Sequence, residues 1–226
     1  MADSDDLIRA VGANIQEKAS LIWSAADTLR GPYKPHEYGL VILPMTVIKR
    51  FHDCLEPTHD AVLAAAEKYK AFAVKDGFLR EASGYPFYNT SKFTFETLRA
   101  DPENIEDNFR DYINGFSENV QDIILTHMKF TDQIERLSDP DAPLLYQIIC
   151  DFCKPQADMS PDKIKAVDMG YIFENLIQRF SESYDEDAGA HFTSRDIVYL
   201  MTDLLIQADS HVFDGDRITK TVYDQT

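Results

Sequence analysis

The residues best suited to bind a ligand lie in the segment Ala190–Asp196, with the sequence Ala-His-Phe-Thr-Ser-Arg-Asp. Thr193, followed three positions later by Asp196, resembles a capping box, which predicts that Thr193 is the N-cap residue of a helix. The start of a helix presents free N–H groups and a partial positive charge, and both favour a bound carboxylate or phosphate. Taken alone, however, the segment is explained more simply as a capped helix with a buried Phe192.

Other residues with chemical potential lack the spacing that their chemistry requires. Cys150 and Cys153 form a lone C-x-x-C pair, whereas a structural zinc site needs a second pair or histidines at ligand spacing. We therefore expect two partly buried cysteines at a helix end. The six histidines form no H-E-x-x-H pattern, and His36 and His52 are expected to be surface or capping residues. The sequence thus predicts no metal site, and it contains no G-x-S-x-G, Walker or G-x-G-x-x-G motif.

Composition limits the class of protein. The 226 residues, 44% of them hydrophobic, suffice for one large domain or two smaller ones. No stretch reaches the apolar length of a membrane span, the acidic start is unlike a signal peptide, and three cysteines argue against a disulfide framework. These features predict a cytoplasmic protein. The net charge of −17 is best explained by solubility, and any nucleic-acid contact must be local or supplied by partners.

Apolar spacing predicts that the first part of the chain is helical. Stripes of apolar residues indicate a long helix that ends at Gly31-Pro32 and a second helix through Leu40 to Leu55, with a kink at Pro44. Residues 76–93 contain Gly and Pro and are expected to form a long loop, which its aromatic residues pin to the body. Shorter helices are expected from Pro57 to Tyr69 and at Thr94–Ala100, Pro102–Phe116, Asn119–Met128 and Pro143–Phe152.

The last quarter of the chain has a different pattern. A helix is expected to start at Ser160-Pro161-Asp162 and to continue to Phe180, and another is expected from Arg195 to about Gln207. A terminal strand, Ile218–Tyr223, follows an acidic turn. A nucleotide-type α/β domain begins with such a strand, and its glycine loop comes directly after it. We therefore expect this chain to be a fragment that stops where a cofactor site would be completed.

These segments together resemble the methylation subunit of type I restriction–modification systems, a family of DNA adenine-N6 methyltransferases. The similarity covers nearly the whole chain, and it lies in several long and distinctive segments that occur in the right order. The segments are Leu21–Gly31, Tyr38–Asp53, Phe87–Ser91, Ile105–Ser117, Gly170–Phe180 and Gly189–Thr193.

The resemblance implies a fold and a cofactor. The fold would be mainly α, with a helical N-terminal domain over residues 1–155. Residues 156–226 would form the first elements of a Rossmann-like α/β methyltransferase domain, truncated after its first strand. The family binds S-adenosylmethionine, so the resemblance implies that the helix start at Thr193 holds the methionine carboxylate while Phe192 packs beside it. The implied cofactor-binding residues are Ala190, His191, Phe192, Thr193, Ser194, Arg195 and Asp224, the last of which opens the glycine-rich motif.

The resemblance also implies a reaction and partners. The parent protein would transfer a methyl group from S-adenosylmethionine to N6 of an adenine that is flipped out of double-stranded DNA. It would work with a specificity subunit, a second copy of the methylation subunit and a restriction subunit. An Asn-Pro-Pro-Phe-type catalytic motif does not occur in these 226 residues, so the chain alone is expected to be inactive and to bind the cofactor very weakly.

Two positions depart from the family pattern, and a second interpretation stays open. The family usually has Pro where Ser194 and Gln225 stand in this sequence. Ser194 suits a first helical turn, whereas Gln225 lies inside the cofactor motif, which is compatible with a divergent or weakened parent enzyme. The second interpretation is a non-catalytic helical module that docks on the specificity subunit or clamps DNA.

Overall fold

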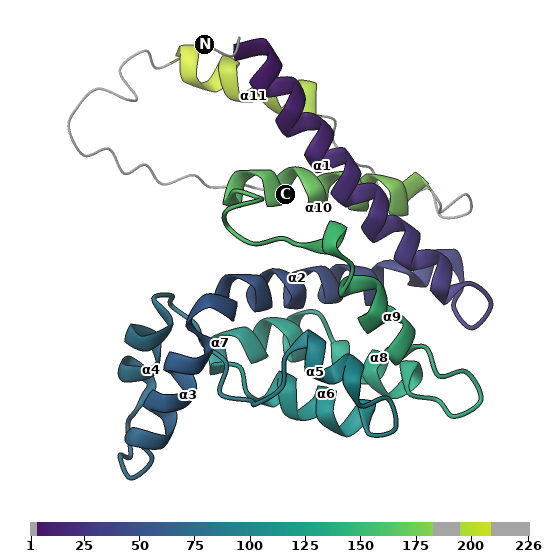
Figure 1. The fold of residues 1–226 in the computed structure, drawn as a ribbon. Coiled ribbons are helices and arrows are strands. Elements are labelled where there is room, and N and C mark those ends of the chain that lie inside the picture. Colours follow the sequence, from purple (N-terminus) through teal and green to yellow (C-terminus); the bar gives the residue numbers. More distant parts are fainter. Residues whose placement is uncertain (1–3, 183–194, 209–226) are drawn as a thin grey trace. The chain divides into compact units, whose positions relative to one another are not determined.

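The computed structural model describes residues 4–182 and 195–208. Within these two ranges all the regular elements are helices and no strand is formed, which confirms the predicted mainly α fold for this part of the chain (Figure 1). The predicted strand Ile218–Tyr223 lies outside the described residues. The chain divides into two compact units, Met1–Asp185 and Glu186–Thr226, and each is described by itself.

Most of the described α-helices belong to the first unit. They are α1 (Ser4–Ala26), α2 (Gly39–Leu55), α3 (His59–Lys68), α4 (Asp76–Ser83), α5 (Phe95–Ala100), α6 (Ile105–Asn114), α7 (Glu118–Gln121), α8 (Phe130–Leu137), α9 (Leu145–Phe152) and α10 (Ala166–Glu182). The shorter elements are η1 (Asp27–Leu29), η2 (Pro35–Glu37), η3 (Glu56–Thr58), the π-helical η4 (Asp122–His127) and η5 (Pro155–Ala157). The second unit contributes α11 (Arg195–Ala208). None of the helices in the described ranges is long and apolar enough to cross a membrane.

Helix α2 is the central element of the first unit, and it packs against α1, α8 and α10 (Figure 1). Pro44 lies inside α2, where it removes one backbone donor, yet the helix continues to Leu55. Helices α1 and α10 also pack together, and the rings of Trp23 and Phe180 meet with centroids 5.1 Å apart. The buried stripe predicted for α10 is largely confirmed, since these members are buried: Met169, Ile172, Leu176 and Phe180.

The other part of the core lies between α5, α6, α8 and α9. Helix α9 packs against α5 and α6, and it also reaches α1. Large aromatic side chains that are almost fully buried fill this space, namely Phe95, Phe109, Tyr112, Phe130 and Phe152. Each buried aromatic side chain of this size contributes about 1.5–3 kcal/mol relative to its exposed state. Burial of these rings is therefore a major source of stability for the helical unit.

The prediction of a long loop over residues 76–93 is wrong for its first half. Asp76–Ser83 form α4, whose Leu79 is fully buried and which packs against α3. Gly84 ends the helix in a left-handed conformation with φ 72°, so this glycine is a C-cap rather than part of an extended loop. Residues 85–94 contain no helix, and Tyr85 and Phe87 pack against the core as expected, with the Phe87 ring 4.8 Å from that of Phe51.

Two predicted helix starts lie too early in the sequence. Helix α6 begins at Ile105 rather than at Pro102, and the Asp101 carboxylate accepts hydrogen bonds from the side-chain amides of Asn104 and Asn108. Helix α10 begins at Ala166 rather than at Ser160, because residues 160–164 form a turn in which the Ser160 carbonyl accepts from two backbone N–H groups. The short helix α8 was not predicted.

Candidate functional site

The predicted cofactor residues lie almost entirely outside the described residues. Residues 190–194, from Ala190 to Ser194, fall in the undescribed range 183–194, and Asp224 falls in the range 209–226. Arg195 is the first residue of α11, as the sequence predicted for the helix that follows Thr193. The cap at Thr193 and the contacts with S-adenosylmethionine therefore stay predictions.

Helix α11 carries the predicted apolar stripe on a surface that is exposed. Its apolar members are each more than half exposed, namely Ile197, Leu200, Met201, Leu204 and Leu205. An exposed stripe of this kind is typical of a helix that packs against further elements. The exposed stripe identifies no ligand by itself.

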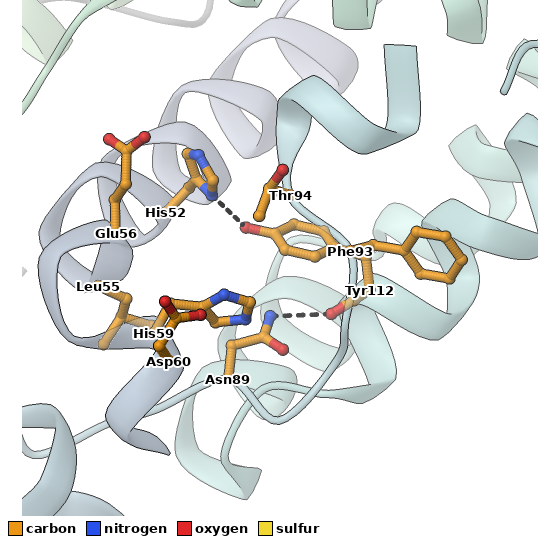
Figure 2. A pocket seen from close by; sticks show the side chains of 9 residues that line it. All are labelled: His52, Leu55, Glu56, His59, Asp60, Asn89, Phe93, Thr94 and Tyr112. Atoms are coloured by element: carbon orange, nitrogen blue, oxygen red, sulfur yellow. Dashed lines mark hydrogen bonds between the residues drawn. The ribbon is translucent and has the colours of Figure 1, made fainter. Parts of the chain in front are cut away.

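A cavity of about 210 Å³ lies in the first unit, where the end of α2 meets α3, α6 and the loop before α5 (Figure 2). Its titratable lining residues are His52 in α2, Glu56 at the start of η3, His59 and Asp60 in α3, and Tyr112 in α6. Figure 2 shows the rings of His52 and His59 on the same side of this space. The remaining lining residues are Leu55, Asn89, Phe93 and Thr94.

The expectation that His52 is a surface or capping residue is wrong, because the residue is only 8% exposed. Its Nδ1 lies 3.2 Å from the Tyr112 hydroxyl, and its ring packs against that of Phe95 at 5.0 Å. Burial, with smaller contributions from the charges of Lys49 and His59, lowers the pKa of His52 to about 3. The imidazole is therefore neutral at pH 7. The sequence held a signal for this burial, since His52 continues the buried positions Val41, Met45 and Ile48 at helical spacing.

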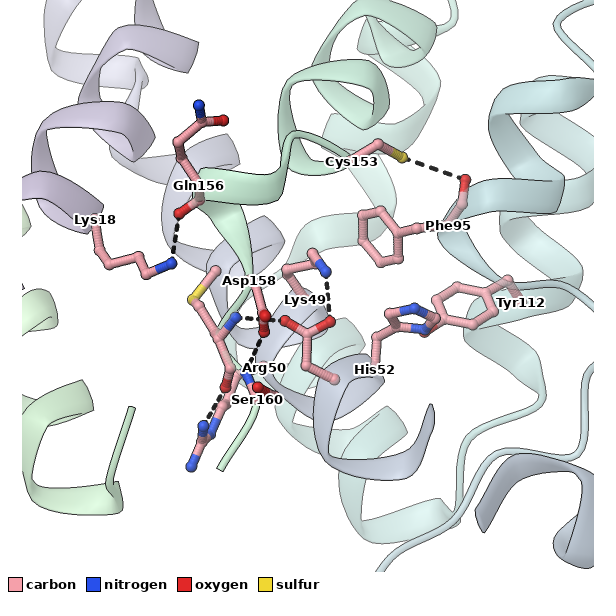
Figure 3. Close-up of polar contacts among 12 residues, drawn as sticks. Lys18, Lys49, Arg50, His52, Phe95, Tyr112, Cys153, Gln156, Asp158 and Ser160 are labelled. Carbon is pink, nitrogen blue, oxygen red and sulfur yellow. Dashed lines mark hydrogen bonds and ion pairs between the residues drawn. The ribbon is translucent and has the colours of Figure 1, made fainter. Parts of the chain in front are cut away.

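A buried ion pair lies beside His52 on α2. Lys49 donates to the Asp53 carboxylate, and the two side chains are 10% and 3% exposed. Asp53 also accepts a 2.7 Å hydrogen bond from the backbone N–H of Met159, and the Lys49 ammonium lies 5.4 Å from the centroid of the Phe95 ring (Figure 3). Burial raises the pKa of Asp53, although Lys49 and the Met159 N–H act in the opposite direction. This pair links α2 to the segment before α10.

One group of side chains in the described residues has a spacing suited to a metal ion. His52, Asp53 and Glu56 each offer one ligand atom, and these atoms all lie within 4.8 Å of one another. His52 and Glu56 are one helical turn apart and line the same cavity, whereas Asp53 lies behind them in the ion pair. The predicted absence of a metal site rested only on standard histidine and cysteine motifs, so these three residues were not considered together.

The cysteines are placed as predicted. Cys150 and Cys153 are both partly buried free thiols at the end of α9. The Cys153 thiol donates to the Phe95 carbonyl at 3.4 Å, and burial raises its pKa to about 11 (Figure 3). A thiol with a raised pKa is a poor nucleophile and a poor metal ligand, because both roles need the thiolate. Cys153 is therefore a structural residue.

The described residues form a helical domain with a small polar cavity. The segment predicted to bind the cofactor lies almost entirely outside the described residues. The chain matches the family model of the HsdM N-terminal domain over residues 18–152, which is more than half of its length. The chain therefore belongs to this family, the N-terminal domain of methylation subunits of type I restriction–modification systems. No curated protein matches the chain.

Proposed function

We propose that this chain is the N-terminal part of the DNA-modification subunit of a type I restriction–modification system. The whole protein transfers a methyl group from S-adenosylmethionine to N6 of adenine in DNA. The single observation that carries the proposal is membership of the HsdM N-terminal domain family over residues 18–152. The segments Gly170–Phe180 and Gly189–Thr193, which follow the matched range, add support because they resemble the lead-in to the catalytic domain of the same family.

In this proposal the helix start after Thr193 binds the methionine carboxylate of the cofactor. Thr193 caps the helix, Phe192 packs beside the cofactor, and Asp224 opens the glycine-rich motif. The dipole of one helix end contributes about 0.3–1 kcal/mol to the binding of a carboxylate, and up to about 2 kcal/mol where it is partly buried. Micromolar affinity needs about 8 kcal/mol. Most of the binding energy must therefore come from the glycine loop and later strands of the complete domain.

The partners follow from the charge as well as from the family. A chain with a net charge of −17 repels the phosphates of DNA, whereas DNA binding draws its non-specific affinity from Lys and Arg. We therefore assign most of the DNA contacts to a specificity subunit and to other parts of the methylation subunit, which is present as two copies. A restriction subunit completes the complex.

The proposal is tested by an assay of the whole protein together with its specificity partner. Unmodified DNA is incubated with labelled S-adenosylmethionine, and its nucleosides are separated after digestion. We expect N6-methyladenine to accumulate with the complex and not with the 226-residue chain alone. If a folded complex forms but no methylated adenine appears on any DNA, the enzyme assignment is wrong.

A second candidate function is a non-catalytic interaction module that docks on the specificity subunit or clamps DNA. The exposed stripe of α11 favours docking for the chain by itself, and the net charge of −17 favours a protein partner such as the specificity subunit over DNA. Gel filtration of the chain mixed with the specificity subunit, or with DNA, tests it directly. A stable complex in either mixture, combined with no methyl transfer by the whole protein, would favour the module over the enzyme.

A further inference from the structure

The group formed by His52, Asp53 and Glu56 has the geometry of a chelating site. Their ligand atoms lie within 4.8 Å of one another, and Glu56 continues the helical backbone at the end of α2 with φ −49° and ψ −45°. Side chains four residues apart on a helix lie on the same face, and metalloproteases use this spacing to bind a metal ion with two side chains of one helix. His52 and Glu56 have this spacing and line one cavity.

The His52 ring is oriented by a hydrogen bond on the side away from the proposed ligand atom. Its Nδ1 lies 3.2 Å from the buried Tyr112 hydroxyl (Figure 2), and the Phe95 ring, which packs against it at a tilt of 51°, restricts the ring further. A histidine that binds a metal commonly holds its other ring nitrogen in such a hydrogen bond, which fixes both the tautomer and the ring plane. With a metal on Nε2, the proton resides on Nδ1 and is donated to the Tyr112 oxygen.

The local charge also suits a cation. Asp53 and Glu56 bring two negative charges, while Lys49 brings one positive charge that Asp53 already shares. A carboxylate offers about four lone-pair directions on its two oxygens. Lys49 and the Met159 N–H use two of those on Asp53, so further directions stay available to a metal ion. The adjoining cavity of about 210 Å³ has room for water molecules that complete the coordination.

We propose that His52, Asp53 and Glu56 bind one divalent cation of the zinc class. One imidazole nitrogen and two carboxylates form a donor set that suits Zn²⁺, Co²⁺ or Ni²⁺, whereas Mg²⁺ and Ca²⁺ prefer oxygen ligands throughout. The site lies in the helical domain and is independent of S-adenosylmethionine and of the predicted cofactor residues. It was not predicted from the sequence, because no standard histidine motif marks it.

The test is a metal titration of the 226-residue chain after treatment with EDTA. Calorimetry with Zn²⁺ and visible absorption with Co²⁺ are expected to give one equivalent of bound metal, with no competition from Mg²⁺. Glu56 is exposed, so Glu56→Gln should keep the fold while it removes one charged ligand. We expect this variant to bind Zn²⁺ at least about tenfold more weakly. Zn²⁺ should also raise the thermal unfolding midpoint of the native chain more than that of the variant.

The matched control is His127→Gln. His127 is an exposed histidine whose Nε2 lies 3.2 Å from the Asp122 carboxylate, so it represents ordinary surface binding. We expect this change to leave the single equivalent unaffected. Absence of saturable binding would overturn the proposal, and so would equal weakening by His127→Gln and Glu56→Gln. His52→Gln is the second ligand variant, and circular dichroism shows whether it keeps its helices; if it does not, Glu56→Gln decides.

Discussion

Gly115 lies where the end of α6 meets the loop that lines the cavity, and we predict that Gly115→Ala destabilises the helical domain strongly. A Cβ at this position would lie 2.6 Å from both the backbone nitrogen and the Cβ of Ser91, and closer still to Oδ1 of Asn89. Real Cβ atoms essentially never approach other atoms within 3.0 Å. Because one of these neighbours is backbone, the loop must move as a whole.

The magnitude follows from the contacts that this close approach allows. The Thr90 N–H donates to the Gly115 carbonyl at 2.8 Å, and the Asn89 side-chain amide donates to the Tyr112 carbonyl at 3.0 Å. Overpacking a tight site costs about 1–3 kcal/mol, and loss of one hydrogen bond adds about 0.5–1.5 kcal/mol. The free energy of unfolding should therefore fall by about 1.5–4.5 kcal/mol. The φ angle of −73° at Gly115 adds no backbone strain.

Urea unfolding, followed by circular dichroism and by the fluorescence of Trp23, measures this change. Gly170→Ala is the matched control, because it adds the same methyl group inside α10 where no atom lies within 4 Å of the new Cβ. Alanine in a helix interior is favoured over glycine by about 0.5–1 kcal/mol, so this variant should be more stable than the native chain. The reasoning is refuted if Gly115→Ala unfolds within about 0.5 kcal/mol of the native chain, or if both variants are equally destabilised.

Three further predictions concern pH and the cofactor. The pKa of His52 is about 3 in the folded chain and 6.5 ordinarily, so the unfolded chain takes up the proton first and stability falls as the pH drops from 6.5 toward 3. In EDTA the free energy of unfolding of the native chain should fall by about 2.3 kcal/mol more than that of His52→Gln between pH 6.5 and 4.5, and equal losses in urea titrations would contradict this. Hydrogen bonds from Arg136 lower the pKa of Glu37 from 4.5 to about 2, so their contribution is present above pH 4.5 and is lost as the pH falls toward 2. In Arg136→Met the unfolding midpoint should fall less than in the native chain as the pH drops from 4.5 toward 2. An unchanged pH dependence would show that the pair adds nothing. In the whole protein, calorimetry should show that Thr193→Ala weakens S-adenosylmethionine binding more than Ser194→Ala, because Thr193 is the proposed cap; equal effects would count against that cap.

Helices with a regular apolar stripe were predictable from the sequence. The stripes of α1, α2 and α10 repeat at the helical period because one face of each helix packs against the core. Buried positions are therefore apolar and exposed positions are polar, and this pattern can be recognised in the sequence. Helices α4 and α8 were missed although α5 and α9, which are no longer than these, were predicted. Thr94 and Pro143 mark the starts of α5 and α9, whereas Lys75 and Lys129, the N-cap residues of α4 and α8, form no side-chain cap. In α4, moreover, Gly77 and the C-cap Gly84 were taken for loop residues.

The cavity and its polar groups could not be predicted in the same way. His52 meets Tyr112 across 60 residues of sequence, and Asp53 meets the Met159 backbone across 106 residues. Such contacts depend on how the helices pack, and no local spacing encodes them. The predicted cofactor residues, by contrast, came from a resemblance to a family. Their placement depends on elements outside the described residues.

The displaced start of α10 has a cause in these same long-range contacts. Lys18 of α1 donates to the Gln156 carbonyl at 2.7 Å (Figure 3). Arg50 of α2 donates to the carbonyls of Met159 and Ile164. Hydrogen bonds from charged groups contribute about 1.5–3 kcal/mol each, more than the helix propensity of several residues. They hold residues 158–164 in a non-helical path across α1 and α2, so the helix cannot begin at Ser160 and starts at Ala166 instead. The polar side chains of α1 and α2 thus fix where the last helix of the first unit begins.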